Sequence, residues 1–172
     1  LIRDFGEIEN LQVSKKGPRD FVTNSDKKAE KIIIDELLKS KKRFSILSEE
    51  AGEIKNDDSD NTWIIDPIDG TLNFLHGVPH FAISIAHRCK NEILSGLIFD
   101  PIKNEMFYAE KNNGSFFNNQ RIRVSNKKNI DECLFASKEK NENMTNSTIR
   151  NLGSAALDMA YVGSGRFDGF FQ

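Results

Sequence analysis

The sequence predicts an α+β protein in which helices pack on β-sheets, and three kinds of observation lead to this prediction. Segments 27–40 and 154–163 have apolar residues at helical spacing. Several short apolar or alternating runs, such as 44–48 and 92–100, have the length and pattern of strands. Polar residues and glycines separate these runs. With 172 residues, the chain is long enough to bury roughly 70% of its unfolded surface.

The first predicted elements are helices. Residues 1–9 have the pattern of the last part of a helix. Residues 27–40 are predicted to form an amphipathic helix whose apolar side consists of Ala29, Ile32, Ile33, Leu37 and Leu38. Either Thr23 or Asn24 can be its N-cap, and Asp26 in the first turn suits the helix dipole. Capping is therefore the simplest role for Asp26.

The predicted strands follow in order along the chain. Residues 44–48 form a short strand that ends in Glu49 and Glu50, and residues 63–65 form a second strand. The second strand is expected to stop at Pro67, because proline has no N–H. Residues 81–88 and 92–100 pair as a hairpin across a polar turn. Further antiparallel strands are predicted at 105–109, 114–117 and 133–136, with a last strand at 167–171 after the helix at 154–163.

Two carboxylates, Asp66 and Asp69, follow the apolar strand at residues 63–65. Unpaired buried charge is very costly, so these carboxylates need a partner, and Mg²⁺ prefers carboxylate and carbonyl oxygens. Gly70 lets the backbone turn sharply and approach a ligand closely. Thr71 is predicted to begin a short helix whose free N–H groups can face an anion. Metal carboxylates beside a phosphate-sized pocket indicate metal-assisted hydrolysis of a phosphate ester.

The same residues also have a simpler interpretation. Aspartate and glycine mark turns, so Asp66 can cap a turn and Asp69 can lie in an ordinary loop. Adjacent glutamates such as Glu49 and Glu50 usually belong to a solvated loop. Here, however, Glu49 follows a strand as Asp66 does. Strand ends at one edge of a sheet are where open α/β-type sites gather their residues, which favours the functional interpretation.

Taken together, three segments resemble the inositol monophosphatase family of lithium-sensitive, Mg²⁺-dependent phosphatases. Residues 63–74 match the signature Trp-x-Ile-Asp-Pro-[Ile/Leu]-Asp-Gly-Thr-x-Asn-Phe throughout, and residues 20–26 match Asp-x-Val-Thr-x-x-Asp. Ser48-Glu49-Glu50 stands in place of the family's Gly-Glu-Glu, and residues 153–158 and 165–171 look like later family segments. The resemblance is closest to the bacterial type. It implies a layered αβαβα sandwich of the inositol monophosphatase and fructose bisphosphatase type, with one domain over residues 1–172.

The resemblance also implies a role for each matching residue. Glu49, Asp66 and the Ile68 carbonyl would hold a first Mg²⁺, and Asp66 and Asp69 would share a second. Thr71, together with Glu49, would orient the attacking water, so the implied catalytic residues are Glu49, Asp66 and Thr71. The other residues would support the metals or contact the substrate: Asp26 in the outer metal shell, the Gly70 and Thr71 amides at the phosphate, and Asp69, Ala155 and Gln172 near the sugar ring.

The implied function is that of a phosphoric monoester hydrolase, which cleaves inositol 1-phosphate or a similar small polyol monophosphate with metal-activated water. A rival is a haloacid-dehalogenase-type phosphatase, which also carries an Asp…Asp-Gly-Thr sequence. Its aspartates stand two residues apart, whereas Asp66 and Asp69 stand three apart with Pro67 between them. A further alternative is a metal-stabilised binding or regulatory protein with weak or vestigial phosphatase activity, because some bacterial relatives have roles beyond hydrolysis.

The chain departs from the family pattern at its end and in one connection. It stops at Gln172, before the Trp-Asp motif that supplies the remaining carboxylate of the second metal. Gln172 also stands where many relatives have a glutamate. Connection 136–149 is shorter than usual and has a disordered composition. We therefore expect a chain that lacks its N-terminal start, its C-terminal part and residues within this connection.

Composition and charge narrow the possible partners. A net charge of −2 and a pI near 6.0 do not favour binding to nucleic acid or to a membrane surface. No apolar run reaches the ~20 residues that a membrane helix needs. Cys89 and Cys133 have no metal or redox spacing, which suits a reducing cytoplasm. We also expect a homodimer and, as ligand, a small phosphomonoester.

Overall fold

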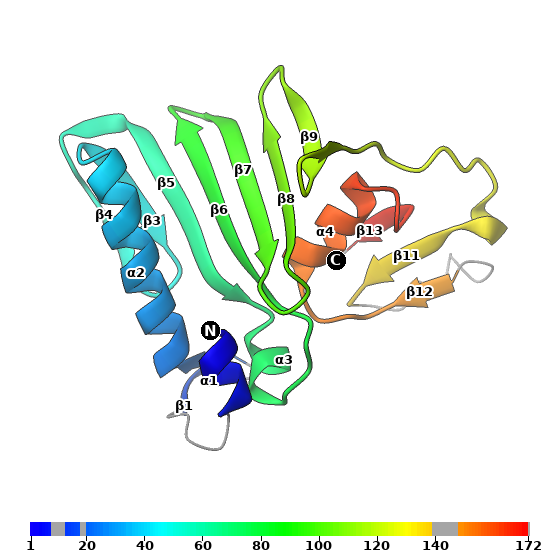
Figure 1. The fold of residues 1–172 in the computed structure, drawn as a ribbon, viewed down its shortest axis with the longest axis horizontal. Helices are drawn as coiled ribbons and strands as arrows, with labels where there is room; N and C mark the ends of the chain where they lie inside the picture. Colours follow the sequence, from blue (N-terminus) through cyan, green and yellow to red (C-terminus); the bar gives the residue numbers. More distant parts are fainter. Residues whose placement is uncertain (8–12, 18–19, 139–147, 172) are drawn as a thin grey trace.

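The computed structural model of the protein describes residues 1–7, 13–17, 20–138 and 148–171. Two β-sheets and two longer helices form successive layers (Figure 1). Among the described residues, no helix is both long and apolar enough to cross a bilayer. The layers follow one another as helix α2, a large sheet, helix α4 and a small sheet, which confirms the predicted α+β class and layered arrangement.

The large sheet has the strand order β10-β9-β8-β7-β6-β5-β3-β4. Within it β3 and β5 run parallel, and the other adjacent pairs are antiparallel. The predicted hairpin is the pair β6 and β7. The bounds are β3 (Phe44–Ser48), β4 (Gly52–Ile54), β5 (Asp58–Asp69), β6 (Ala82–Cys89), β7 (Glu92–Asp100), β8 (Glu105–Glu110), β9 (Gly114–Phe117) and β10 (Gln120–Arg121).

Strand β5 continues past Pro67 to Asp69, so the prediction that it stops at Pro67 is wrong. Asp66 pairs with Ser84 and Asp69 pairs with Ala82, which places two residues of β5 opposite one residue of β6. This arrangement is a β-bulge. Pro67 lies inside the bulge, where no ladder hydrogen bond is required of it, and the pairing resumes at Asp69.

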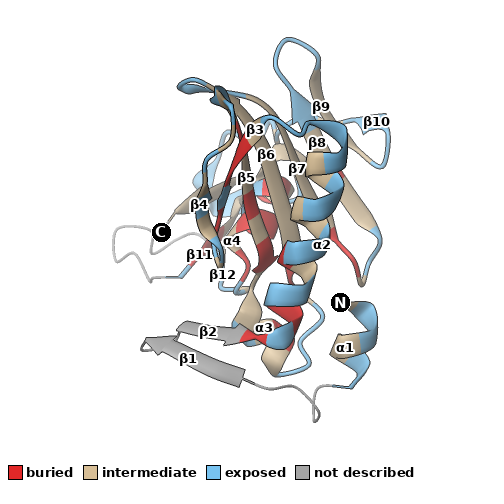
Figure 2. Ribbon diagram, turned by 90° about the vertical axis from the view of Figure 1, so that its left-hand side faces the viewer, coloured by how far each residue is buried: buried red, intermediate tan, exposed pale blue. Residues whose placement is uncertain are grey.

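Helix α2 (Asn24–Ser40) begins earlier than the predicted residue 27, and Thr23, one of the two predicted N-caps, forms a capping box with Asp26. The Thr23 hydroxyl accepts from the Asp26 amide at 3.3 Å, and the Asp26 carboxylate accepts from the Thr23 amide at 2.9 Å. The predicted apolar face is wrong at Ile32, which is 63% exposed, whereas Glu30 is buried. Glu30 follows Asp26 by one helical turn, so this side faces inward and Ile32 faces outward. Figure 2 shows the outer side of α2 exposed along one face of the large sheet.

Helix α4 (Ala155–Gly163) packs on the opposite face. Strand pairing puts Ser48, Ile65 and Ile85 on the face that α2 covers, where Ser48 bonds to Glu30. Ala82 is three residues before Ile85 on β6, so its side chain points to the opposite face of the sheet. There it belongs to a core cluster with Leu157 of α4. Ser154 is the N-cap of α4, and its side chain accepts from the Leu157 amide.

The small sheet has the order β12-β11-β13, and its strands are parallel. The prediction of an antiparallel strand at 133–136 is therefore wrong in direction. Parallel strands need a crossover instead of a hairpin. Helix α4 is part of the connection from β12 to β13, which pair with β11 on opposite sides. The last strand also begins later than predicted, at Gly169. The bounds are β11 (Leu134–Ser137), β12 (Thr148–Arg150) and β13 (Gly169–Phe171), with a short 3-10 helix η2 (Ile130–Glu132) before β11.

One end of the large sheet collects the remaining short elements. Helices α1 (Ile2–Gly6) and α3 (Thr71–Leu75) lie there beside the end of β5 and the start of α2 (Figure 1). The strands β1 (Val13–Gly17) and β2 (Asp20–Thr23) pair antiparallel and lead into α2. Helix α1 corresponds to the predicted helix tail at 1–9, of which residues 8 and 9 lie outside the described residues. Phe5 of α1 packs against Phe74 and Phe81, which fixes this end of the molecule.

Candidate metal centre

Glu49 and Asp66 are neighbours because β3 and β5 are parallel and in register. Ser48 pairs with Ile65, so the residues that follow these two reach the same edge of the sheet. The Glu49 amide donates to the Ile65 carbonyl at 3.2 Å, which holds Glu49 beside β5. The carboxyl groups of Glu49 and Asp66 are within hydrogen-bonding reach of each other. The structure therefore brings together the two acidic strand ends that the sequence singles out.

Asp66 lies among like charges in a partly buried position. Burial, followed by the charges of Glu49 and Asp69, raises the pKa of Asp66 to about 8. Burial and neighbouring carboxylates both disfavour the ionised form. A cation at this place would reverse the electrostatic part of that effect. This arrangement suits a site that holds a positive ion.

The bulge in β5 places Ile68 and Thr71 next to Asp26. The Ile68 amide donates to Asp66 Oδ1 at 3.1 Å. The Thr71 hydroxyl donates to the Ile68 carbonyl at 3.0 Å and lies 3.5 Å from Asp26 Oδ1. Burial raises the pKa of Asp26, although hydrogen bonds from Thr23 lower it. Asp26 thus caps α2 through Oδ2 and contacts Thr71 through Oδ1.

Asp69 connects β5 to the start of α4. Its Oδ2 accepts hydrogen bonds from the Ser154 hydroxyl and, at 2.8 Å, from the Ala156 amide. Ser154 Oγ also accepts from the Leu157 amide at 3.3 Å, as the N-cap of α4. Ala155 lies between the two residues that bond to Asp69. Both predicted sugar-ring contacts that the structure describes, Asp69 and Ala155, therefore occur side by side.

Gly70 makes the turn from β5 into α3. Its φ is +94°, in the left-handed region that favours glycine. A Cβ at this position would lie 3.2 Å from the His80 carbonyl oxygen and 3.3 Å from the Gly153 carbonyl oxygen. Helix α3 begins at Thr71, as predicted, and the amides of its first turn have no acceptor within the helix. Gly70 is thus required by both backbone conformation and space.

The described residues do not form a ready-made metal cage. Within the described part of the chain, no three His, Cys, Asp or Glu side chains converge closely enough to hold an ion. Asp69 is instead bonded to the Ser154 hydroxyl and the Ala156 amide. The donor chemistry nevertheless fits Mg²⁺, because the Glu49 and Asp66 carboxylates and the Ile68 carbonyl are all hard oxygen ligands.

Gln172, the remaining predicted substrate contact, lies outside the described residues. Its predicted role near the sugar ring therefore stays a prediction.

Two buried carboxylates near the site had no role in the sequence prediction. Glu30 is 6% exposed and bonds to the segment that carries Glu49. Its place one turn after Asp26 on α2 is a signal that could have identified it. Asp158 is 4% exposed, and burial followed by the charge of Asp69 raises its pKa to about 6. Nothing near Asp158 in the sequence indicates its burial.

Asn73 is a third residue without a predicted role. Its side-chain amide donates to the carbonyls of His80 and Leu152, each at 2.7 Å. These two bonds tie α3 to the start of β6 and to the segment that precedes α4. Asn73 therefore joins the two parts of the chain that meet at Gly70 and Asp69.

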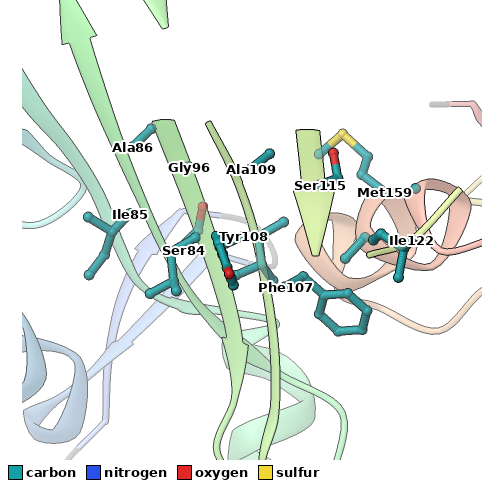
Figure 3. Close-up of a pocket in the computed structure, with 14 residues that line it drawn as sticks. Ser84, Ile85, Ala86, Gly96, Phe107, Tyr108, Ala109, Ser115, Ile122 and Met159 are labelled. Atoms are coloured by element: carbon teal, nitrogen blue, oxygen red, sulfur yellow. The ribbon is translucent and has the colours of Figure 1, made fainter. Parts of the chain in front are cut away.

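An apolar hollow of about 260 Å³ lies away from these carboxylates, between the large sheet and α4 (Figure 3). Ser84, Ala86, Phe107 and Met159 are among the residues that line it. None of its lining residues is acidic, so it contributes no ligand to the candidate metal centre.

Comparisons with known proteins identify relatives of the whole chain. The model of the inositol monophosphatase family matches residues 2–172. The chain is 44% identical over 187 aligned positions to an inositol-1-monophosphatase of Rhizobium meliloti, covering 100% of this chain and 70% of that protein. It is 40% identical to the Nus factor SuhB of Escherichia coli K12, with the same coverage. The crystal structure of the extragenic suppressor protein suhB from Bartonella henselae superposes with a TM-score of 0.95 at 46% identity, covering 98% of this chain and 70% of that one.

Proposed function

Since the chain belongs to the inositol monophosphatase family, we propose that it is a Mg²⁺-dependent phosphomonoesterase acting on inositol 1-phosphate or similar small polyol monophosphates. The single observation that carries this proposal is the parallel register of β3 and β5, which places Glu49 beside Asp66. The Glu49 and Asp66 carboxylates and the Ile68 carbonyl then lie at one end of the large sheet, next to the turn at Gly70.

Glu49, Asp66 and the Ile68 carbonyl would hold the first Mg²⁺, and Asp66 and Asp69 would share a second. A Mg²⁺ ion held by these residues would supply a bound water of lowered pKa and positive charge beside the phosphoryl and leaving oxygens. The carboxylates then need not be protonated, although the pKa of Asp66 is about 8 without a cation. Cation binding and the ionisation of Asp66 therefore support each other.

Thr71 and Asp26 orient the groups on the reacting side. The Thr71 hydroxyl lies between the Ile68 carbonyl and Asp26 Oδ1, so its position is fixed from two directions. With Glu49, it can orient the attacking water, and the Gly70 and Thr71 amides at the start of α3 can bind phosphoryl oxygens. Positioned donors of this kind act without reorganisation during the reaction.

Asp69 and the start of α4 form the wall where the polyol would bind. Asp69 is held by Ser154 and the Ala156 amide, so its second oxygen can accept from a substrate hydroxyl. Ala155 has a small side chain and leaves room for a ring. A ring with several hydroxyl groups fits such a wall better than a flexible alkyl phosphate does.

A second candidate function is a binding or regulatory role in which hydrolysis is weak. The observation that favours it is the 40% identity to a protein named a Nus factor. That role would not require turnover, so activity separates the two proposals. A homodimer and a cytoplasmic location stay predictions, and the predicted location derives from the two isolated cysteines.

The test is a panel of phosphomonoesters assayed for phosphate release with Mg²⁺, with and without lithium. The panel contains inositol 1-phosphate, a second polyol phosphate, a nucleoside monophosphate and an aryl phosphate. We expect Mg²⁺-dependent turnover that favours the polyol phosphates and that lithium inhibits. Absence of turnover on every substrate would refute the proposal and favour the regulatory role.

A further inference from the structure

Glu30 is an acidic side chain in an unusual position. It lies near the middle of α2 and is 6% exposed, whereas most acidic residues of surface helices face the solvent. A buried carboxylate is stable only when hydrogen bonds satisfy it. The partners of Glu30 therefore show what its burial achieves.

Three donors converge on one oxygen of Glu30. The Glu50 amide donates to Oε1 at 2.9 Å and the Ala51 amide donates to it at 3.0 Å. The Ser48 hydroxyl also donates to Oε1. Ser48 is the last residue of β3, and Glu50 and Ala51 lie in the turn between β3 and β4. Glu49 therefore stands between two residues that bond to Glu30.

The backbone at Glu49 is consequently fixed on both sides. Before the turn, the Glu49 amide bonds to the Ile65 carbonyl of β5 at 3.2 Å. After it, the amides of Glu50 and Ala51 bond to Glu30 of α2. These hydrogen bonds fix the backbone of Glu49 in a position from which its side chain reaches Asp66.

The same side of α2 also holds the other half of the centre. Asp26, one turn before Glu30, contacts the Thr71 hydroxyl, which in turn bonds to the Ile68 carbonyl. One rigid helix thus supports both segments that carry the oxygen ligands. Groups that orient metal ligands commonly change metal affinity by about 10–100-fold when they are removed.

We propose that Glu30 is a positioning residue, which holds the turn after β3 so that Glu49 faces Asp66 in the geometry that binds the metal ion. The inference rests on the proposed function, because it assumes that Glu49 and Asp66 are metal ligands. Glu30 itself binds neither metal nor substrate. It acts through the backbone of Glu50 and Ala51.

Three substitutions separate position from charge. Glu30→Gln removes the charge and keeps an acceptor oxygen at the same distance. Glu30→Asp keeps the charge but is one methylene shorter, so it cannot reach the two amides. Glu30→Ala removes both. The matched control is Glu36→Ala on the same helix, because Glu36 is exposed and bonds to Lys39.

The measurements are the Kd for Mn²⁺, followed by its electron paramagnetic resonance signal, and hydrogen exchange at the amides of residues 50 and 51. All are made well below the Tm of each variant. We expect Glu30→Asp and Glu30→Ala to weaken Mn²⁺ binding at least about tenfold and to speed exchange at both amides. We expect Glu30→Gln to stay within about threefold of wild type in Kd, and Glu36→Ala to equal wild type.

Two results would overturn the proposal. If Glu30→Asp binds like wild type while Glu30→Gln binds as weakly as Glu30→Ala, the residue acts through its charge and not through its position. If the variants lose Tm but keep the Kd, its role is structural. A wild-type protein that binds Mn²⁺ but hydrolyses no phosphomonoester would instead refute the proposed function, and the Kd series would still decide the role of Glu30.

Discussion

Replacing Asp66 by asparagine should make the metal-free protein more stable at alkaline pH. Burial and the charges of Glu49 and Asp69 raise the pKa of Asp66 to about 8, so its ionised form is unfavourable in the folded state. Below its ordinary pKa near 3.8, the carboxyl is neutral in both folded and unfolded chains. Between about pH 4 and pH 8 the unfolded state can ionise freely and the folded state cannot. Wild type therefore loses stability with rising pH relative to Asp66→Asn, and the difference levels off above pH 8.

The size of this effect follows from the pKa shift. A shift from 3.8 to about 8 has an upper limit of about 6 kcal/mol, at 1.36 kcal/mol per pH unit. Asp66 is only partly buried, and solvent screening reduces the effect, so we expect about 2 kcal/mol at pH 8.5. For a protein of 172 residues this corresponds to a Tm difference of about 4–8 °C.

The assay is thermal unfolding of wild type and Asp66→Asn in EDTA from pH 5 to pH 9, and again in Mg²⁺. Asp35→Asn, at an exposed position of α2, is the control for a charge removed outside the site. Mg²⁺ should raise the Tm of wild type more than that of Asp66→Asn, because the ion binds the carboxylate that the variant lacks. A Tm difference in EDTA that does not grow with pH would refute the reasoning, as would equal protection of both proteins by Mg²⁺.

Three further substitutions test other parts of the site. Thr71→Ala should lower kcat by at least about tenfold with little change in KM in steady-state kinetics, because its hydroxyl acts in the transition state. A change in KM alone would make Thr71 a binding residue. Gly70→Ala should lower the free energy of unfolding in urea by about 1–3 kcal/mol, because φ at this position is +94° and the added Cβ would lie 3.2 Å from the His80 carbonyl oxygen. An unchanged midpoint of urea unfolding would contradict this reasoning. Ser154→Ala should lower the free energy of unfolding by about 0.5–2 kcal/mol, because the N-cap of α4 is lost. It should also raise KM for a polyol phosphate, because the hydrogen bond that holds Asp69 is lost. An unaltered KM would show that Asp69 does not bind the substrate.

Local signals explain the parts of the structure that the sequence predicted well. The cap at Thr23, the turn at Gly70 and the start of α3 at Thr71 each depend on the conformational preference of one or two residues. The sequence also singled out Glu49 and Asp66 together, because each comes directly after a short apolar run, and the parallel register of β3 and β5 brings them together. These features need no knowledge of distant contacts.

Long-range contacts explain what the sequence did not predict. The hydrogen bond from Ser154 to Asp69 joins residues 85 positions apart, so no local pattern indicates it. The parallel direction of β11 depends on the crossover through α4 and not on its own residues. Pro67 has no N–H, as the prediction assumed, but it lies in a β-bulge where no strand hydrogen bond is needed, so β5 continues to Asp69.

The central proposal is that Glu49, Asp66, the Ile68 carbonyl and Asp69 hold Mg²⁺ for the hydrolysis of phosphomonoesters. Its most direct test is phosphate release from inositol 1-phosphate, measured while Mg²⁺ is titrated into EDTA-treated wild type and Asp66→Asn. Wild type should show no release without Mg²⁺ and a saturable rise with it, and Asp66→Asn should stay near background throughout. Release in EDTA, no release at any Mg²⁺ concentration, or turnover by folded Asp66→Asn equal to wild type would contradict the claim.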